Sequence, residues 1–430
     1  MAGDGVGGTR GRWDAAEGRV REVACDESGS DGENLLGGNT DVFAHASVAL
    51  PVDAAAECVR EIRHRIRSPA EEYKANHLLR EKHRAVLVWL LSADGPIHGR
   101  AHVHLTEKAF LVVDRAVGLL LGDPADAVSL YRQGPEVFGT DAWRTFLVTA
   151  NALLRVRPGG PRNRGGQAVP ATGDTPHAAG KAPQATGETP HAAGKAPQAT
   201  GETPHAAGKG SSTTGEAPGA AGEDTPTTGE APNTAGKALP GVGEASGTPE
   251  DAFFATVDAL VRAAPESEAA GILRRLAARR QRAEAYRTRM RAAPALFPVL
   301  NPLFPALRHT AAHWSADGRP VVLVHDRQNA LTPGRTARIV QAARRDGIAL
   351  HGLRLVDSRD DARVQIADFL AGIARRIASD ELAGTGDPEL TACLRPYVAA
   401  ESVWGDARSR VRLAPAGETP GRATEINSGV

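Results

Sequence analysis

The chain has 430 residues, a formal net charge of zero and 41% hydrophobic residues. A neutral chain has no global field that draws it to nucleic acid or to an acidic membrane, so electrostatic binding must come from local patches. The sequence has no apolar leader and no run of about 18 apolar residues, which predicts a cytoplasmic protein without a membrane partner. Its three cysteines, Cys25, Cys58 and Cys393, are widely spaced and indicate buried thiols.

The first predicted strand ends in two adjacent acids. The apolar residues 23–25 lead into Asp26 and Glu27, and Ser28-Gly29 then favours a turn. Asp26 is therefore expected at the rim of a sheet, where it can hold a divalent metal if other carboxylates converge on it. On its own, an Asp in this place more often starts a turn. A second strand over 42–50 is expected to form a hairpin with the first.

A mainly helical stretch follows, with one further strand. Glu72 and Lys74 precede a long helical pattern, and by themselves they are typical of a solvated helix start. In the strand at 101–106, His102 and His104 share a face. We interpret that face as a partly exposed sheet surface rather than a metal site, because no cysteine or third histidine lies nearby in the sequence.

The composition changes completely between residues 157 and 248. A 14-residue repeat rich in Gly, Pro and Ala begins at Ala171 and Ala185, and a partial copy starts at Ala199. The repeats contain no aliphatic side chain larger than Ala, so stacked copies would bury almost no apolar surface. This pattern predicts a disordered, low-complexity insertion.

An arginine-rich helix is predicted between residues 274 and 291. Two interpretations remain open. The arginines, among them Arg275, Arg279 and Arg282, contact nucleic-acid phosphates, or they form a solvated face packed on acidic neighbours.

The clearest strand is 320–326, which ends in Asp326, and a helix and a second strand at 348–356 follow it. This order predicts a parallel pair. The last strong element is a helix from residue 364 to about 379, on which Gln365 and Asp368 lie beside the apolar stripe.

Four acids thus lie at element ends or on a core helix: Asp26, Glu72, Asp326 and Asp368. If the strands that carry Asp26 and Asp326 are neighbours, these two carboxylates meet at one rim, and the helix with Asp368 can bring a third. Oxygen ligands without cysteine are what Mg²⁺ or Mn²⁺ prefers.

Several of these motifs occur together in a known family. Asp26-Glu27-Ser28-Gly29, Glu72-x-Lys74, the strand ending in Asp326, and Asp357-Ser358 followed by Gln365-Ile-Ala-Asp368 resemble the bacterial family catalogued as "domain of unknown function 3800". The resemblance covers roughly residues 21 to 120 and 318 to 380. It implies a ribonuclease-H-like fold with a two-metal acidic rim at Asp26, Glu72, Asp326 and Asp368. Glu27, Ser28, Lys74 and Gln365 would be supporting residues. Glu107 is a rival to Glu72, because in ribonuclease H the second acid lies after the third strand.

The expected fold class is α/β, a mixed ribonuclease-H-like sheet with helices on both faces, interrupted by the disordered insertion. The expected parts are a flexible N-terminus (1–19), the first half of the domain (20–156), the insertion (157–248), the second half with the arginine-rich helix (249–404) and a flexible tail (405–430).

Two functions of different kinds follow. The first is a metal-dependent nuclease or related phosphodiester hydrolase that acts on nucleic acid. The second is a non-catalytic interaction protein that retains the fold, in which the acids are structural. A serine or cysteine hydrolase is disfavoured, because the sequence has no Gly-x-Ser-x-Gly motif and no cysteine in an activating context.

Overall fold

Five strands of mixed direction form the central sheet of the protein. The computed structural model describes residues 20–67, 75–156, 247–293 and 298–415. The strands are β1 (Arg21–Ser28), β2 (Val42–Val48), β3 (Ala101–Glu107), β4 (Val321–Asp326) and β5 (Leu350–Val356), in the order β3-β2-β1-β4-β5. β2 runs antiparallel to β1 and β3, whereas the pairs β1–β4 and β4–β5 are parallel. The predicted hairpin, the predicted parallel pair and the α/β class are confirmed.

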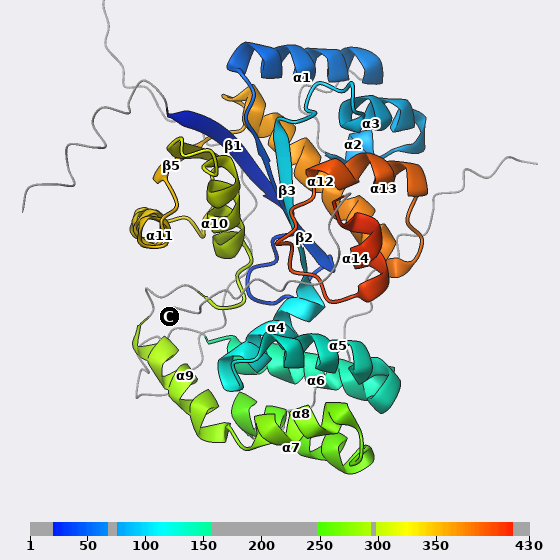
Figure 1. Cartoon of the computed structure of the whole chain (residues 1–430), viewed down its shortest axis with the longest axis vertical. Helices are drawn as coiled ribbons and strands as arrows, with labels where there is room; N and C mark the ends of the chain where they lie inside the picture. The colour runs from blue at the N-terminus through cyan, green and yellow to red at the C-terminus, as the bar shows by residue number, and fades with distance from the viewer. Residues whose placement is uncertain (1–19, 68–74, 157–246, 294–297, 416–430) are drawn as a thin grey trace, which may run out of the picture. The chain divides into compact units, whose positions relative to one another are not determined.

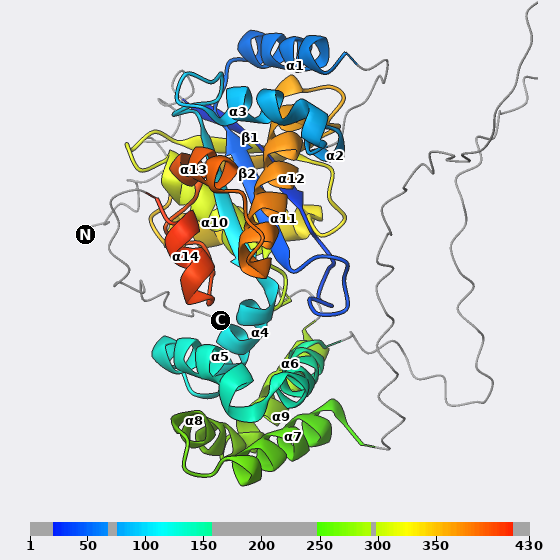
Figure 2. The same cartoon turned by 90° about the vertical axis from the view of Figure 1, so that its right-hand side faces the viewer.

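Helices cover both faces of the sheet. Because side chains alternate along a strand, successive strand residues pack against the helices on opposite faces. Ala24, Ala44 and Val324 pack with α1 (Val52–Ile66) and α12 (Ala362–Ala383). Cys25, Phe43 and Leu323 pack under α10 (Leu303–Trp314) and α11 (Pro333–Arg345). Figures 1 and 2 show these two layers on opposite sides of the strands. The shorter elements on the α12 side are α2 (Ala75–Leu78), a 3₁₀ turn (Glu81–His83), α3 (Arg84–Leu91), α13 (Pro388–Leu394), a second 3₁₀ turn (Arg395–Tyr397) and α14 (Ala407–Leu413).

A separate apolar core joins six helices from both sides of the insertion. They are α4 (Lys108–Leu120), α5 (Pro124–Phe138), α6 (Thr140–Leu154), α7 (Pro249–Ala263), α8 (Glu268–Ala277) and α9 (Arg280–Ala292). Residues 249–293, which are expected in the second half of the domain, pack against α4–α6 of the first half. The insertion therefore interrupts a helical cluster, and the described residues on both sides of it belong to one compact unit. The repeats lie outside the described residues.

Two further expectations differ from the structure. A flexible tail is expected from residue 405, but Ala407–Leu413 forms α14, and Trp404 Nε1 donates to Ser409 Oγ at 2.7 Å. Cys25 and Cys58 are buried as expected, whereas Cys393 is only half-buried. In the described parts of the chain, no helix has the length and apolarity needed to cross a lipid bilayer.

A glycine on α12 allows α2 to approach closely. A Cβ added at Gly372 would lie 2.2 Å from Ala75 Cβ, which is closer than two carbon atoms can come without a shift. We expect Gly372→Ala to lower the free energy of unfolding by about 1–3 kcal/mol, measured by urea denaturation. The matched control is Gly118→Ala on α4. A Cβ there meets no atom within 4 Å, and the change should stabilise the protein by about 0.5–1 kcal/mol. Equal effects at the two sites would contradict the close approach.

Candidate functional site

Three of the four predicted acids lie at one end of the sheet and on one of its faces. In the parallel pair β1–β4, Cys25 lies opposite His325, so the next residues along the two strands, Asp26 and Asp326, are neighbours. Both alternate onto the face that packs against α12, which carries Asp368. The structure thus brings Asp26, Asp326 and Asp368 together, as the sequence analysis expects. Glu72 and Lys74 lie outside the described residues.

Burial and mutual repulsion dominate the electrostatics of this acid cluster. Asp26 is 8% exposed. Burial, followed by the charges of Glu27, Asp368 and Asp326, raises its pKa to about 9, although a hydrogen bond from Glu27 N to its Oδ1 acts in the opposite sense. An ionised Asp26 is therefore costly in this position unless a cation neutralises it.

Neighbouring residues fix the orientation of the cluster. Asp326 Oδ1 accepts a hydrogen bond from Ser358 N at 3.0 Å, and Gln365 Nε2 donates to Ser358 O at 3.0 Å. Gln365 therefore supports the loop that caps Asp326. Ser28 Oγ accepts from Arg375 Nε at 3.0 Å, and Arg375 lies on α12 two turns after Asp368. Burial lowers the pKa of Arg375, and the nearby Asp41 partly offsets this effect.

Both carboxylate oxygens of Glu107, the rival to Glu72, accept hydrogen bonds from other residues of the protein. It ends β3 and is fully buried. Its Oε2 accepts hydrogen bonds from Gly405 N at 2.7 Å and Asp406 N at 3.0 Å, and its Oε1 accepts from Tyr131. Burial raises its pKa, and these hydrogen bonds oppose the shift. A carboxylate satisfied in this way is a structural anchor for the chain after Trp404 rather than a metal ligand.

The sequence analysis did not identify a histidine beside the acids. His325 precedes Asp326 and is fully buried on the opposite face, where its Nε2 lies 3.3 Å from Glu27 Oε2. One ligand atom each from Asp26, Glu27 and His325 lie within 4.8 Å of one another. The sequence held part of the signal, because alternation along β4 places His325 on the face opposite to that of Asp326. Its position beside Glu27 also requires the register between β1 and β4.

The residues at this rim fit a divalent cation. Asp26 is buried among like charges, and Glu27 Oε2 is buried without a hydrogen bond to any other described residue. Oxygen atoms that are both anionic and unsatisfied lower their free energy most by binding a cation.

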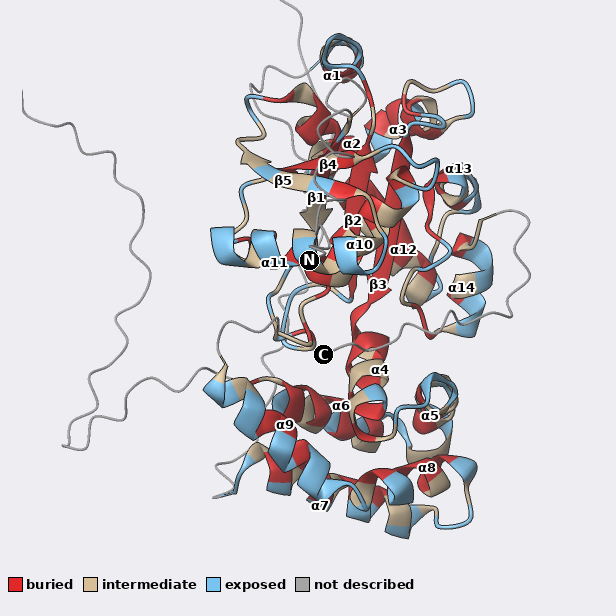
Figure 3. Cartoon of the chain, turned by 60° about the vertical axis from the view of Figure 1, so that its left-hand side comes forward, coloured by how far each residue is buried: buried red, intermediate tan, exposed pale blue. Residues whose placement is uncertain are grey.

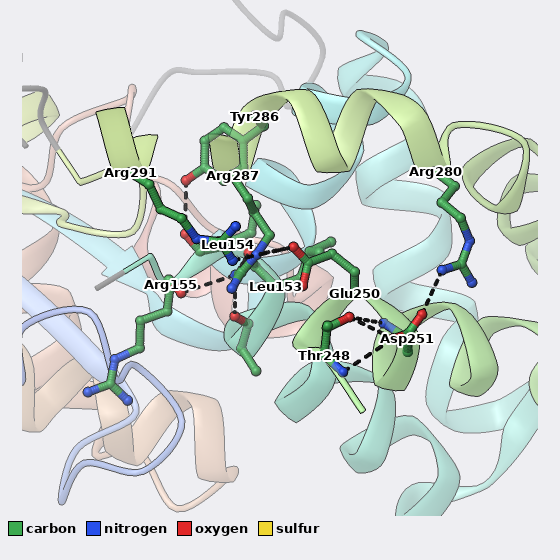
Figure 4. Close-up of polar contacts among 11 residues, drawn as sticks. Leu153, Leu154, Arg155, Thr248, Glu250, Asp251, Arg280, Tyr286, Arg287 and Arg291 are labelled. Carbon is green, nitrogen blue, oxygen red and sulfur yellow. Dashed lines mark hydrogen bonds and ion pairs between the residues drawn. The ribbon is translucent and has the colours of Figure 1, made fainter. Parts of the chain in front are cut away.

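The arginine-rich segment is two helices, not one, and several of its side chains bind acids of the protein itself. Arg275 contacts Asp126 at 2.5 Å, and Arg280 contacts Asp251 at 3.0 Å. Arg287 contacts Glu250 at 2.5 Å and donates to the carbonyl of Leu153 at 2.6 Å (Figure 4). These contacts favour packing on acidic neighbours for this part of the segment. Arg279 and Arg282 are exposed, and Arg282 also donates to Leu120 O at 3.4 Å.

Arg287 joins the two ends of the chain that flank the insertion. It binds Glu250 of α7 and the last carbonyls of α6, and only 5% of it is exposed. We expect Arg287→Met to lower the free energy of unfolding by about 3–5 kcal/mol, because the carbonyls lose their donor and Glu250 keeps only the longer contact with Arg291 at 3.7 Å. Arg287→Lys should restore only part of this, since an ammonium group cannot make several divergent hydrogen bonds. The control is the exposed Arg289→Met, expected to change stability by about 0.5 kcal/mol or less. Urea denaturation checks all three variants, and similar losses at both positions would contradict the role of Arg287.

The face expected to be a partly exposed sheet surface is instead a buried layer of histidines. His45, His102 and His104 are at most 6% exposed and lie under α10. Figure 3 shows that β2 and β3, which carry them, are buried along their whole length. His102 stacks on His313 with centroids 3.8 Å apart, and His104 stacks on His309 at 5.0 Å. The expectation was wrong because the partner histidines come from α10, about 200 residues later in the chain.

Comparison with protein-family models, with curated proteins and with solved structures found no match.

Proposed function

We propose that the protein is a divalent-metal-dependent phosphodiester hydrolase with a ribonuclease-H-like fold that acts on nucleic acid. The observation that carries the proposal is the convergence of Asp26, Asp326 and Asp368 on one face at the ends of two adjacent parallel strands. A mixed sheet with helices on both faces supports the fold assignment and the resemblance to the domain-of-unknown-function family. Carboxylate clusters of this type suit Mg²⁺ or Mn²⁺.

Each acid has a distinct place in the proposed site. Asp26 and Asp326 approach the metal position from the sheet, and Asp368 approaches it from α12. Glu72, which the family resemblance adds to the set, would supply a fourth carboxylate. Two bound divalent ions activate a water molecule and stabilise the leaving oxygen in phosphodiester hydrolysis. Ser358 and Gln365 fix the carboxylate of Asp326 before substrate binds.

A cation for the substrate phosphate lies on the same helix. Arg375 follows Asp368 by two helical turns and binds Ser28, which shares the strand and the face of Asp26. We assign Arg375 a positioning role toward a phosphate next to the scissile one. Arg279 and Arg282 remain proposed contacts for the nucleic-acid backbone farther along, whereas Arg275 is already paired with Asp126.

The test is cleavage of end-labelled single-stranded DNA, duplex DNA, RNA and RNA–DNA hybrid with Mg²⁺, Mn²⁺ or EDTA. Wild type is compared with Asp26→Asn, Asp368→Asn and, as a control, Asp53→Asn in the exposed first turn of α1. We expect metal-dependent cleavage of at least one substrate, which Asp26→Asn and Asp368→Asn reduce by about 100-fold or more and Asp53→Asn leaves unchanged. If folded wild-type protein cleaves no substrate and Mn²⁺ leaves its melting temperature unchanged, the proposal is wrong and a non-catalytic interaction protein is favoured.

A further inference from the structure

The atoms of His325 identify which of its nitrogens carries a proton. His325 Nδ1 lies 2.9 Å from the backbone oxygen of Asp326, and a carbonyl oxygen only accepts hydrogen bonds. Nδ1 is therefore the protonated nitrogen, and in a neutral ring Nε2 carries a lone pair. This arrangement, with one nitrogen bound to a backbone carbonyl and the other directed away from it, is the one that metal-binding histidines adopt.

The lone pair of Nε2 faces a carboxylate. Glu27 Oε2 is 3.3 Å away, and neither atom makes a hydrogen bond with another described residue. His325 is fully buried, and the side chain of Glu27 is 8% exposed, so solvent does not separate them. Two acceptors facing each other in a dry site repel one another, and only a cation or a proton between them makes the contact favourable.

The separation favours a metal ion over a proton. A charge-assisted hydrogen bond between nitrogen and oxygen is about 2.7–2.9 Å long, shorter than the observed 3.3 Å. A nitrogen and an oxygen that are each about 2.1 Å from one metal, at an angle between 90° and 109°, lie about 3.0–3.4 Å apart. Asp26 offers a third ligand atom within 4.8 Å of the other two.

Neighbouring groups orient the other two ligands as well. Gln328 Nε2 donates to Glu27 Oε1, which leaves Glu27 Oε2 directed at His325. Asp26 Oδ1 accepts from Glu27 N at 2.8 Å, so its second oxygen remains for a ligand. Fixed partners of this kind reduce the entropy that the ligands lose when they bind a metal.

We propose that Asp26, Glu27 and His325 form a site for a first-row transition-metal dication, such as Zn²⁺ or Co²⁺, that prefers these ions to Mg²⁺. Imidazole nitrogen is a good ligand for these metals and a poor one for Mg²⁺, which takes oxygen ligands. The site shares Asp26 with the proposed hydrolase cluster but does not require phosphodiester cleavage.

The test is Co²⁺ binding to the full chain, followed by visible absorption and isothermal titration. We expect one Co²⁺ to bind more tightly than any other, and Glu27→Gln and His325→Gln each to weaken this binding by about 100-fold or more. An excess of Mg²⁺ of about 100-fold should not displace it, whereas Zn²⁺ should. The controls are His104→Gln, a buried histidine whose Nε2 lies 3.2 Å from the backbone oxygen of Glu401, and Asp368→Asn. Both should retain Co²⁺.

If His325→Gln does not fold, the nitrogen ligand can still be detected in the wild-type protein. Pulsed electron paramagnetic resonance of the Mn²⁺-loaded protein should show coupling to an imidazole nitrogen, and Glu27→Gln should abolish the signal. No Co²⁺ binding, equal binding by all variants, displacement by an equal concentration of Mg²⁺, or absence of nitrogen coupling would each overturn the proposal. These readouts do not depend on cleavage, so an inactive protein that binds Co²⁺ through His325 would refute only the hydrolase.

Discussion

We expect the buried histidines to make the protein sensitive to acid. Burial, with some repulsion from neighbouring histidines, lowers the pKa of His45 and His102 well below the usual value, and burial lowers the pKa of His104 to about 3. The unfolded chain takes up these protons near pH 6.5, whereas the folded chain does not. The stability that neutral histidines provide is therefore complete above pH 6.5 and is lost as the pH falls toward 3, by up to about 1.4 kcal/mol per pH unit for each residue.

The measurement is urea denaturation at pH 7.5, 6.5 and 5.5 for wild type and for a variant with His102→Asn and His104→Gln. The variant should be less stable than wild type at pH 7.5, because it loses stacking on α10. Between pH 6.5 and 5.5 it should lose about 2 kcal/mol less than wild type. Asp26 opposes the trend, since its raised pKa favours the folded state as the pH falls, but it is common to both proteins. The exposed His351→Gln is the control, and a variant whose pH dependence equals that of wild type would contradict the role of the buried layer.

The second large effect concerns Asp26. Its pKa of about 9 in the folded protein, against about 4 in an unfolded chain, means that ionisation opposes folding between these values. The contribution of Asp26 to stability should therefore decline as the pH rises from 4 to 9 without metal. At pH 8 in EDTA, Asp26→Asn should raise the melting temperature by about 5 °C or more, because the amide still accepts from Glu27 N and carries no charge. Mn²⁺ should raise the melting temperature of wild type and leave that of the variant almost unchanged.

A matched aspartate should respond in the opposite direction. Asp361 is also buried, at 9% exposed, but burial is outweighed by hydrogen bonds from Arg363, which lower its pKa. Asp361→Asn should therefore lower the melting temperature in EDTA by several degrees. If both substitutions destabilise the protein equally, the charge of Asp26 is compensated within the fold and the metal interpretation of the cluster fails.

Local pattern predicted the elements that hold the acids. The apolar run before Asp26, the run before Asp326 and the stripe beside Asp368 each indicate one strand or helix. That these three acids meet was predicted only on the condition that the two strands are neighbours, and the family resemblance implied the same rim. The sequence analysis also anticipated the face shared by His102 and His104, because side chains alternate along a strand.

The segment that covers a face of the sheet can lie far away along the chain, and local sequence patterns do not identify it. α10 follows the insertion and supplies His309 and His313, so the exposed histidine surface expected from β3 alone was wrong. The pairing of Glu27 with His325 depends on the register between β1 and β4, which a single strand does not specify. In the same way, the charge of α9 was visible in the sequence, whereas its pairing with Glu250 was not.

The contacts of Arg287 have a consequence for the connectivity of the protein. Residues 153 and 250 both touch this one side chain, so the described segments on the two sides of the insertion are held next to each other by the fold itself. A specific protease site introduced between residues 157 and 246 would divide the chain into two fragments, one with β1–β3 and Asp26, the other with β4, β5, Asp326 and Asp368. The two fragments meet in the sheet through the parallel pair β1–β4, and α7–α9 of the second fragment pack against α4–α6 of the first. The fragments should therefore remain associated after cleavage. Neither fragment alone carries all three acids. If the two fragments are separated and then mixed, recovery of metal binding would show that the site has reassembled.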